Sequence, residues 1–328
     1  MNPPEKTELL SVVFARDLQT ERPQDRWLIE RLWGREAVGV IGGHAKSLKS
    51  WLGLDFAISV ASGTPALDRF RVEAPGTALI YLAEDGLPQV RARLEAICRH
   101  RGIPIANLEV AVITEPTVRL DSQRDQMRLR ATVAHLRPRL LLLDPLVRLH
   151  SLDENSSQDI SRLLGYLRDL QRSLELAVIL VHHTSKRSHA QPGQSLRGSS
   201  DLHAFGDSNA YLARKGEEVL LTLEHRSAKA PQPMVLRLAC FNDGAASHLE
   251  LLNHLTTDPA EVSIENRLVT LLDGRRPLTR TQLRSELRVN NQRLGQALCA
   301  MENAGKIRRT SGGWLRYSSP TDDAKDLT

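Results

Sequence analysis

The chain has 328 residues, more than one hydrophobic core usually holds, and this length predicts one domain of about 250 residues followed by a smaller unit. With 41% hydrophobic and 25% charged residues, no apparent signal peptide and no apolar run of about 18 residues, the composition argues against a membrane protein, and we expect a cytoplasmic one. The three cysteines, Cys98, Cys240 and Cys299, form no CxxC pair, which argues against a disulfide framework or a zinc ribbon.

Residues 1–25 contain no recognisable motif, and we interpret them as a flexible leader or an arm that links subunits. From residue 37 to about 183, short apolar runs alternate with amphipathic stretches, which is typical of a mainly parallel sheet with helices on both faces. The expected strands are 37–42, 77–85, 108–114, 139–144 and 177–183, and the expected helices are 50–62, 88–102, 124–136 and 159–174. An antiparallel edge extension is predicted from the closely spaced strands 209–216, 218–226 and 233–241. We therefore expect an α/β domain over residues 26–258.

Beyond residue 258 the pattern changes to three helices and a hairpin. The helices are expected at 262–274, 279–288 and 290–305, followed by two short strands within 306–318. Thr279 and Gln282 have the spacing of a capping box, which predicts the start of the second helix. This order of elements resembles a winged helix-turn-helix domain. We expect that domain over residues 259–318 and an acidic tail over 319–328.

The C-terminal stretch is also basic. From Pro259 onward there are 12 Lys or Arg against 8 Asp or Glu, so +4 of the net charge of +5 lies there. The winged-helix resemblance implies contact with duplex DNA through the third helix, with Asn290, Asn291, Gln292, Arg293 and Gln296 at the bases, and through phosphate contacts from Lys306, Arg308, Arg309 and Arg316. A protein-binding module with a solvated basic surface is the alternative.

One segment between a strand and a helix has the spacing of a phosphate-binding loop. The pattern GxxxxGK(S/T) presents backbone amides, a lysine and a hydroxyl to a nucleotide and its magnesium ion. Here it is carried by Gly43, His44, Ala45, Lys46, Ser47, Leu48, Lys49 and Ser50. Leu48 replaces the last glycine, so we expect a loop with a negative φ at that residue and Lys46 as an auxiliary cation. A glycine-rich turn with two incidental lysines is the alternative.

Carboxylates follow two of the other expected strands. Asp144 comes after four leucines, the form of a strand whose terminal acid orients magnesium. Glu84 and Asp85 end the strand 77–85, where an acid could activate water for attack on a γ-phosphate. Each feature alone is weak. Together with Lys49 and Ser50, they predict a site that binds ATP and Mg²⁺ and hydrolyses ATP.

These motifs resemble the RecA-like P-loop ATPases, and specifically the RepA-type subgroup found with plasmid and mobile-element replication. The resemblance spans about residues 25–243 and is carried by GGHAKSLKS, YLAEDG, LLLLDP, LVHHTSK and LRGSSDL. It implies that Glu84 is the catalytic base and that His182 and His183 are sensors near the γ-phosphate. It also implies that the loop through Ser185 to Ser200, with Arg197 in the LRGSSDL signature, approaches DNA in the channel of a ring, which we take to be a hexamer.

The resemblance further implies an arginine supplied by a neighbouring subunit. We choose Arg226, which ends a late strand, although the chain departs from the family here. Asp207 stands where the family's arginine would align, and the nearest cation is Arg214. An ordinary surface arginine is the alternative for Arg226, and a metal cluster that includes His189 is an alternative for the histidine pair.

The favoured function is a helicase-like ring motor on single-stranded DNA, placed on duplex DNA by its C-terminal domain. Three alternatives stay open. The first is an ATP-dependent regulator that binds one DNA site without unwinding, and the second is an adaptor that recruits another protein. The third is a small-molecule kinase, for which we find no acceptor pocket in the sequence.

Overall fold

The computed structural model describes residues 11–18, 26–153, 156–184, 201–241, 245–252, 264–273, 277–287, 289 and 291–316. The chain forms two compact units, Met1–Leu252 and Asn253–Thr328. Within the described ranges, no helix has the length and apolar character needed to cross a lipid bilayer. The predicted DNA-approaching loop, including Arg197 and His189, lies outside the described residues.

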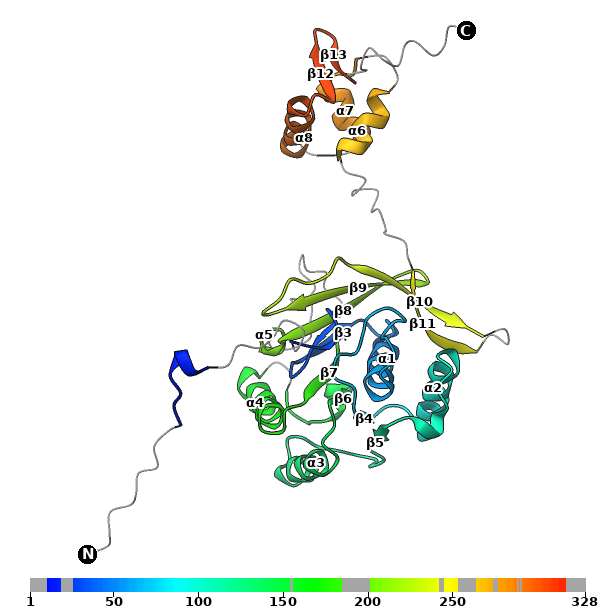
Figure 1. Ribbon diagram of the computed structural model, residues 1–328, viewed down its shortest axis with the longest axis vertical. Coiled ribbons are helices and arrows are strands. Elements are labelled where there is room, and N and C mark those ends of the chain that lie inside the picture. The colour runs from blue at the N-terminus through cyan, green and yellow to red at the C-terminus, as the bar shows by residue number, and fades with distance from the viewer. Residues whose placement is uncertain are drawn as a thin grey trace, which may run out of the picture. The chain divides into compact units, whose positions relative to one another are not determined.

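A nine-stranded sheet forms the first unit, in the order β11-β10-β9-β8-β3-β7-β6-β4-β5 (Figure 1). Neighbouring strands pair in parallel from β5 to β8 and antiparallel from β8 to β11. The strands are β3 (Val38–Gly43), β4 (Ala78–Leu82), β5 (Val110–Val112), β6 (Leu140–Asp144), β7 (Ala177–His183), β8 (Ser208–Lys215), β9 (Glu218–His225), β10 (Met234–Cys240) and β11 (Ala246–Leu252). This arrangement confirms the predicted RecA-like α/β fold with an antiparallel extension.

Helices cover both faces of the sheet. Helices α1 (Lys49–Ser62) and α2 (Leu87–His100) lie on one face, and α3 (Gln123–Leu136) and α4 (Ser157–Leu174) lie on the other (Figure 1). The leucines of β6 show why its sequence is continuously apolar. Leu140 and Leu142 pack in the core with α1 and α2, whereas Leu141 and Leu143 pack in the core with α3 and α4. Successive side chains of a strand point to opposite faces, so both must be apolar here.

Some edge elements were missed by the sequence analysis. A two-stranded hairpin, β1 (Trp27–Ile29) and β2 (Trp33–Gly34), precedes the sheet, and β11 adds a fourth antiparallel strand. The segment that forms β11, ASHLELL, contains few β-branched or aromatic residues. It becomes a strand because β10 supplies hydrogen-bonding partners and Leu249 is buried in the core. The short helix α5 (Asp201–Phe205) was not expected either.

The second unit contains the three helices and the hairpin expected from its sequence. They are α6 (Ile264–Leu272), α7 (Arg280–Leu287), α8 (Asn291–Asn303), β12 (Ile307–Thr310) and β13 (Gly313–Arg316). The capping box at α7 is confirmed, since the Thr279 amide donates to Gln282 Oε1 at 2.9 Å and the Gln282 amide donates to Thr279 Oγ1 at 3.3 Å. A separate apolar core lies between the helices, with Leu268, Leu283 and Leu298 among its members. The winged-helix assignment stays a prediction.

Candidate active site

The predicted phosphate-binding loop connects β3 to α1. It follows the carboxyl end of a central parallel strand, the position where open α/β sheets bind their ligands. Gly43 begins the loop, and a Cβ there would lie 2.4 Å from Ser47 Oγ and 2.6 Å from the Leu212 carbonyl oxygen, so only glycine fits. The next three residues, His44, Ala45 and Lys46, are exposed, whereas Ser47 is buried. A tight loop that opens a helix N-terminus directs backbone amides toward an anion.

The expectation of a negative φ at Leu48 is wrong. Leu48 is the N-cap of α1 and has a left-handed backbone, with φ 67° and ψ 20°. Its carbonyl accepts the first hydrogen bond of the helix, from Leu52 at 3.0 Å, and its side chain packs against the core under α1. Lys46 also has a positive φ, of 61°. The loop therefore keeps the backbone that a glycine would adopt, and core packing holds leucine in it despite the cost.

Lys49 is buried and turned back onto its own loop. Its Nζ donates to the His44 carbonyl at 2.8 Å. Burial lowers the pKa of the ammonium group, while the neighbouring carboxylates of Asp144 and Glu84 act in the opposite direction. His44 Nδ1 lies 3.3 Å from Thr184 Oγ1 at the end of β7. Lys49 is thus already at the loop, held by a carbonyl that a phosphate could replace.

Ser50 and Asp144 meet beside Lys49. The Ser50 hydroxyl hydrogen-bonds to Asp144, whose carboxyl group is almost completely buried. Burial raises the pKa of Asp144 to about 6, against the opposing effects of Ser50 and Lys49. The second carboxylate oxygen, Oδ2, is buried and has no hydrogen-bond partner among the described residues. A hydroxyl beside a carboxylate with an unused oxygen fits Mg²⁺, which takes oxygen ligands and keeps several waters.

Glu84 lies at the same edge of the sheet because β4 and β6 are parallel neighbours. Leu82 is paired with Asp144, and the Ala83 amide donates to the Asp144 carbonyl at 2.7 Å. The Glu84 side chain is 47% exposed, and its Oε1 accepts from Arg148 Nε at 2.8 Å. A solvent-facing cavity of about 530 Å³ is lined there by Tyr81, Ala83, Glu84, Pro116, Thr117, Arg119 and Arg148. Glu84 is therefore accessible to water, but it is engaged by an arginine.

Asp85, the neighbouring acid, is in a different position. Its carboxylate forms an ion pair with Arg93 of α2, and both side chains are largely covered. Arg93 also lies over the ring of Trp51, with 5.8 Å between its guanidinium carbon and the ring centroid. This contact holds Asp85 against α2, away from the solvent that reaches Glu84. Of the two acids, Glu84 is the better placed to activate a water molecule.

His182 and His183 lie next to the start of the loop. Strand β7 is parallel to β3, and the register pairs Gly42 with His182 and Gly43 with His183. His182 is buried and His183 is partly exposed. The amide of Thr184 donates to the Gly43 carbonyl at 3.1 Å, which couples the end of β7 to the loop. This position is compatible with the predicted sensor role, which stays a prediction.

Arg226 lies at the opposite edge of the sheet. Its amide donates to the Asp207 carbonyl at 2.9 Å, and its Nη1 lies 3.2 Å from Asp207 Oδ1. The Asp207 amide in turn donates to the Val38 carbonyl at 2.7 Å, at the first residue of β3. The phosphate loop leaves the other end of this six-residue strand, so roughly 17 Å separate the two sites along the strand at about 3.3 Å per residue. Arg226 cannot reach the phosphate loop of its own chain.

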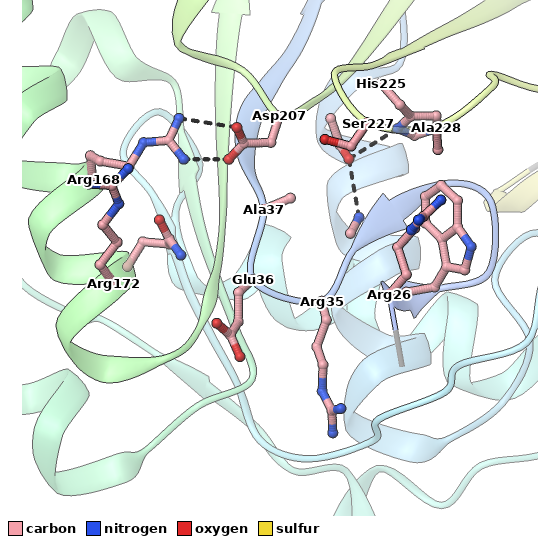
Figure 2. A pocket seen from close by; sticks show the side chains of 14 residues that line it. Arg26, Arg35, Glu36, Ala37, Arg168, Arg172, Asp207, His225, Ser227 and Ala228 are labelled. Atoms are coloured by element: carbon pink, nitrogen blue, oxygen red, sulfur yellow. Dashed lines mark hydrogen bonds and ion pairs between the residues drawn. The ribbon is translucent and has the colours of Figure 1, made fainter. Parts of the chain in front are cut away.

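Asp207 organises a basic pocket at that edge. Its carboxylate binds Arg168 of α4 through two hydrogen bonds, one of which measures 3.3 Å (Figure 2). The pocket has a volume of about 400 Å³, and Arg26, Arg35 and Arg172 also line it. Arg226 is 52% exposed beside these groups. The aspartate that replaces the family's arginine thus holds two arginines in place.

Three residues near the loop were missed by the sequence analysis. They are Arg148, which binds Glu84, Thr184, which contacts His44, and Arg214, whose Nη1 donates to the Lys46 carbonyl at 2.8 Å. Arg148 follows Asp144 by four residues, and this spacing was the only signal for it. Arg214 belongs to β8, two strands away from β7 in the sheet. Only the fold brings it to the loop.

In the second unit the predicted phosphate contacts lie at the hairpin. Lys306, Arg308 and Arg309 are exposed, and Arg309 lies over the Trp314 ring. Arg316 is paired with Asp273. Asn290 lies outside the described residues, and so do the side chains of the other predicted base contacts.

The comparisons with known proteins concern the first unit. A family model described as "AAA domain" matches residues 3–189, more than half of the chain and all of the segments that carry Lys49, Glu84, Asp144 and the histidine pair. Among solved structures, the ATPase domain of a helicase is 17% identical and covers 66% of this chain and 86% of its own, with a TM-score of 0.49. The RadB recombinase is 18% identical and covers 66% of this chain and 92% of its own, with a TM-score of 0.48. On the family match, the chain belongs to the AAA domain family, and its first unit is a RecA-like P-loop ATPase core.

Proposed function

We propose that this chain hydrolyses ATP and uses the energy to move on or remodel DNA as a ring, which we take to be a hexamer of the RepA type. The observation that carries the ATPase assignment is the meeting of Lys49, Ser50, Asp144 and Glu84 at one edge of the parallel sheet. The described residues there supply a phosphate lysine, a pair of oxygen ligands and a solvent-facing acid. These are the groups that phosphoryl transfer to water requires.

Each group has a specific task in this mechanism. On nucleotide binding, Lys49 exchanges the His44 carbonyl for phosphate oxygens, and the loop amides bind the remaining charge. Ser50 and Asp144 would hold Mg²⁺, which neutralises charge that develops on the phosphates. Glu84 orients a water molecule and accepts its proton, for which its carboxylate must first leave Arg148. His182 or His183 then relays the phosphate state through β7 to the segment that follows.

The position of Arg226 supports a site completed by a second subunit. Because Arg226 lies at the edge opposite to its own phosphate loop, it can stabilise a transferring phosphate only on another copy of the chain. Two defective variants test this. Lys49→Ala and Arg226→Ala should each be inactive alone, and their mixture should recover part of the activity because mixed rings contain intact composite sites. A mixture as inactive as its components would exclude Arg226 as the arginine that acts in trans.

DNA contact is proposed for both units, with single-stranded DNA through the ring and duplex DNA through residues 259–318. Support comes from the exposed basic residues Lys306, Arg308 and Arg309 on the hairpin of the second unit. Single-stranded DNA should stimulate ATP hydrolysis several-fold, and deletion of residues 259–328 should remove salt-sensitive duplex binding. Hydrolysis indifferent to DNA would exclude the motor.

A regulator or adaptor without helicase activity is the second candidate. It is favoured by the same basic hairpin, because a separate compact unit can recognise one DNA site without any strand separation. A fork-unwinding assay separates the two candidates. Unwinding supports the motor, whereas site-specific duplex binding with no unwinding supports the regulator.

A further inference from the structure

Three side chains with metal-binding chemistry meet far from the phosphate loop. Asp68 lies in the loop after α1, His100 is the last residue of α2, and His248 belongs to β11. His100 Nε2 lies 2.7 Å from Asp68 Oδ2. The imidazole rings of His100 and His248 are stacked, with centroids 3.3 Å apart and planes inclined by 10°. One nitrogen or oxygen atom from each of the three residues lies within 4.8 Å of the others.

We propose that Asp68, His100 and His248 form a binding site for a divalent transition-metal ion, for which Zn²⁺ is the probe. Two imidazolium cations would repel each other at the distance of this stack, so at least one ring is neutral and has a lone pair to donate. Imidazole nitrogen and carboxylate oxygen are the ligands that zinc prefers, whereas Mg²⁺ and Ca²⁺ take oxygen. Three protein ligands leave one tetrahedral position for water.

The spacing requires only local adjustment. Bonds of about 2.0–2.1 Å in a tetrahedron place ligand atoms roughly 3.3 Å apart, so the three atoms must approach one another by about 1 Å or less, and the rings must turn from their parallel stack to face the ion. Asp68 is 51% exposed and His100 is 30% exposed, which leaves room for these rotations and a path for the ion. The Ser247 hydroxyl lies 2.9 Å from His248 Nδ1. This contact leaves Nε2 of that ring for the metal.

A nearby arginine does not prevent the site from forming. Arg101 Nε lies 3.8 Å from Asp68 Oδ1 and competes for that carboxylate. Its Nη2, however, is already bound to the buried Asp55 at 2.5 Å, and its Nη1 donates to Ser59 at 2.8 Å. Arg101 therefore stays paired when Asp68 turns to a metal ion. Asp68 is free to become a ligand at little electrostatic cost.

The site joins elements that are otherwise held only by packing. Helix α1 has 14 residues between the phosphate loop and the loop that carries Asp68, which places the metal site about 20 Å from the nucleotide site at 1.5 Å per residue. A bound ion would tie the edge strand β11 to α2. We therefore expect zinc to stabilise the first unit without entering the ATP site.

Titration of the full-length, chelator-treated chain with Zn²⁺ alone tests this proposal by calorimetry. We expect about one ion per chain, a higher melting temperature with zinc, and a loss of affinity of about tenfold or more in His100→Ala or His248→Ala. His135→Ala removes an exposed histidine on α3 and should bind zinc as wild type does. Asp68→Asn, at an exposed loop position, gives a third variant in case a histidine variant fails to fold.

Two outcomes would overturn the proposal. One is wild-type zinc affinity in folded variants of all three residues. The other is zinc binding that survives His100→Ala and His248→Ala but is lost in His189→Ala, which would move the ion to the histidines that follow β7. Co²⁺ gives a second readout. A tetrahedral visible spectrum that His248→Ala abolishes supports the site, and a spectrum unchanged by that variant contradicts it.

Discussion

The left-handed backbone of Leu48 makes an unusual prediction for the order of stability of two variants. Leu48→Ala and Leu48→Gly both remove the packing of the leucine side chain against the core. They differ by one Cβ. At φ 67° a Cβ costs about 1–2 kcal/mol, whereas glycine loses roughly 0.5–1 kcal/mol more chain entropy than alanine on folding. The glycine variant should therefore be the more stable of the two by up to about 1 kcal/mol.

Calorimetric melting of the two variants without nucleotide measures this difference. For a domain of this size, 1 kcal/mol corresponds to roughly 2–4 °C, so the glycine variant should melt higher than the alanine variant by a few degrees. It should also retain ATP turnover, because the backbone of its loop is unchanged. At a residue with negative φ the order would reverse, since alanine is then favoured by about 0.5–1 kcal/mol. An alanine variant that melts higher would refute the left-handed loop.

Other predictions concern the acids and the arginine near the loop. Glu84→Gln should bind ATP as wild type does in an equilibrium assay and lose hydrolysis; equal turnover would exclude Glu84 as the base. Arg148→Ala should raise DNA-independent turnover because it frees Glu84, and an unchanged rate would show that the ion pair imposes no restraint. Burial raises the pKa of Asp144 from 3.8 to about 6, so its contribution to stability is full below about pH 3.8 and lost as the pH rises through 6. In urea melts without magnesium, wild type should lose up to about 3 kcal/mol over that window. Asp144→Asn should flatten the profile, and identical profiles would contradict the assignment.

Periodic patterns predicted the parts of the fold that repeat. The four leucines before Asp144 indicated a strand covered on both faces, and the structure divides them between two cores. The capping box of Thr279 and Gln282 is confirmed by its two hydrogen bonds. In each case the pattern is local, because a few consecutive residues determine the geometry. Acids at the ends of parallel strands could also be placed together, since β4 and β6 end at the same edge.

Contacts between distant segments could not be predicted in this way. Arg148 reaches Glu84 across 64 positions of sequence, and Arg214 reaches the Lys46 carbonyl across 168. Neither residue has a local signature. The conformation of Leu48 was predicted wrongly from the intrinsic preference of leucine, because packing of its side chain against the core outweighs that preference.

ATP hydrolysis by wild type and by Lys49→Ala, each with no DNA, with single-stranded DNA and with duplex DNA, tests the account most directly. Lys49 is buried at the loop beside Asp144, and no other described lysine has this position. We predict wild-type turnover that single-stranded DNA stimulates several-fold, and no turnover in the variant under any condition. Equal turnover in wild type and Lys49→Ala would contradict the proposed active site.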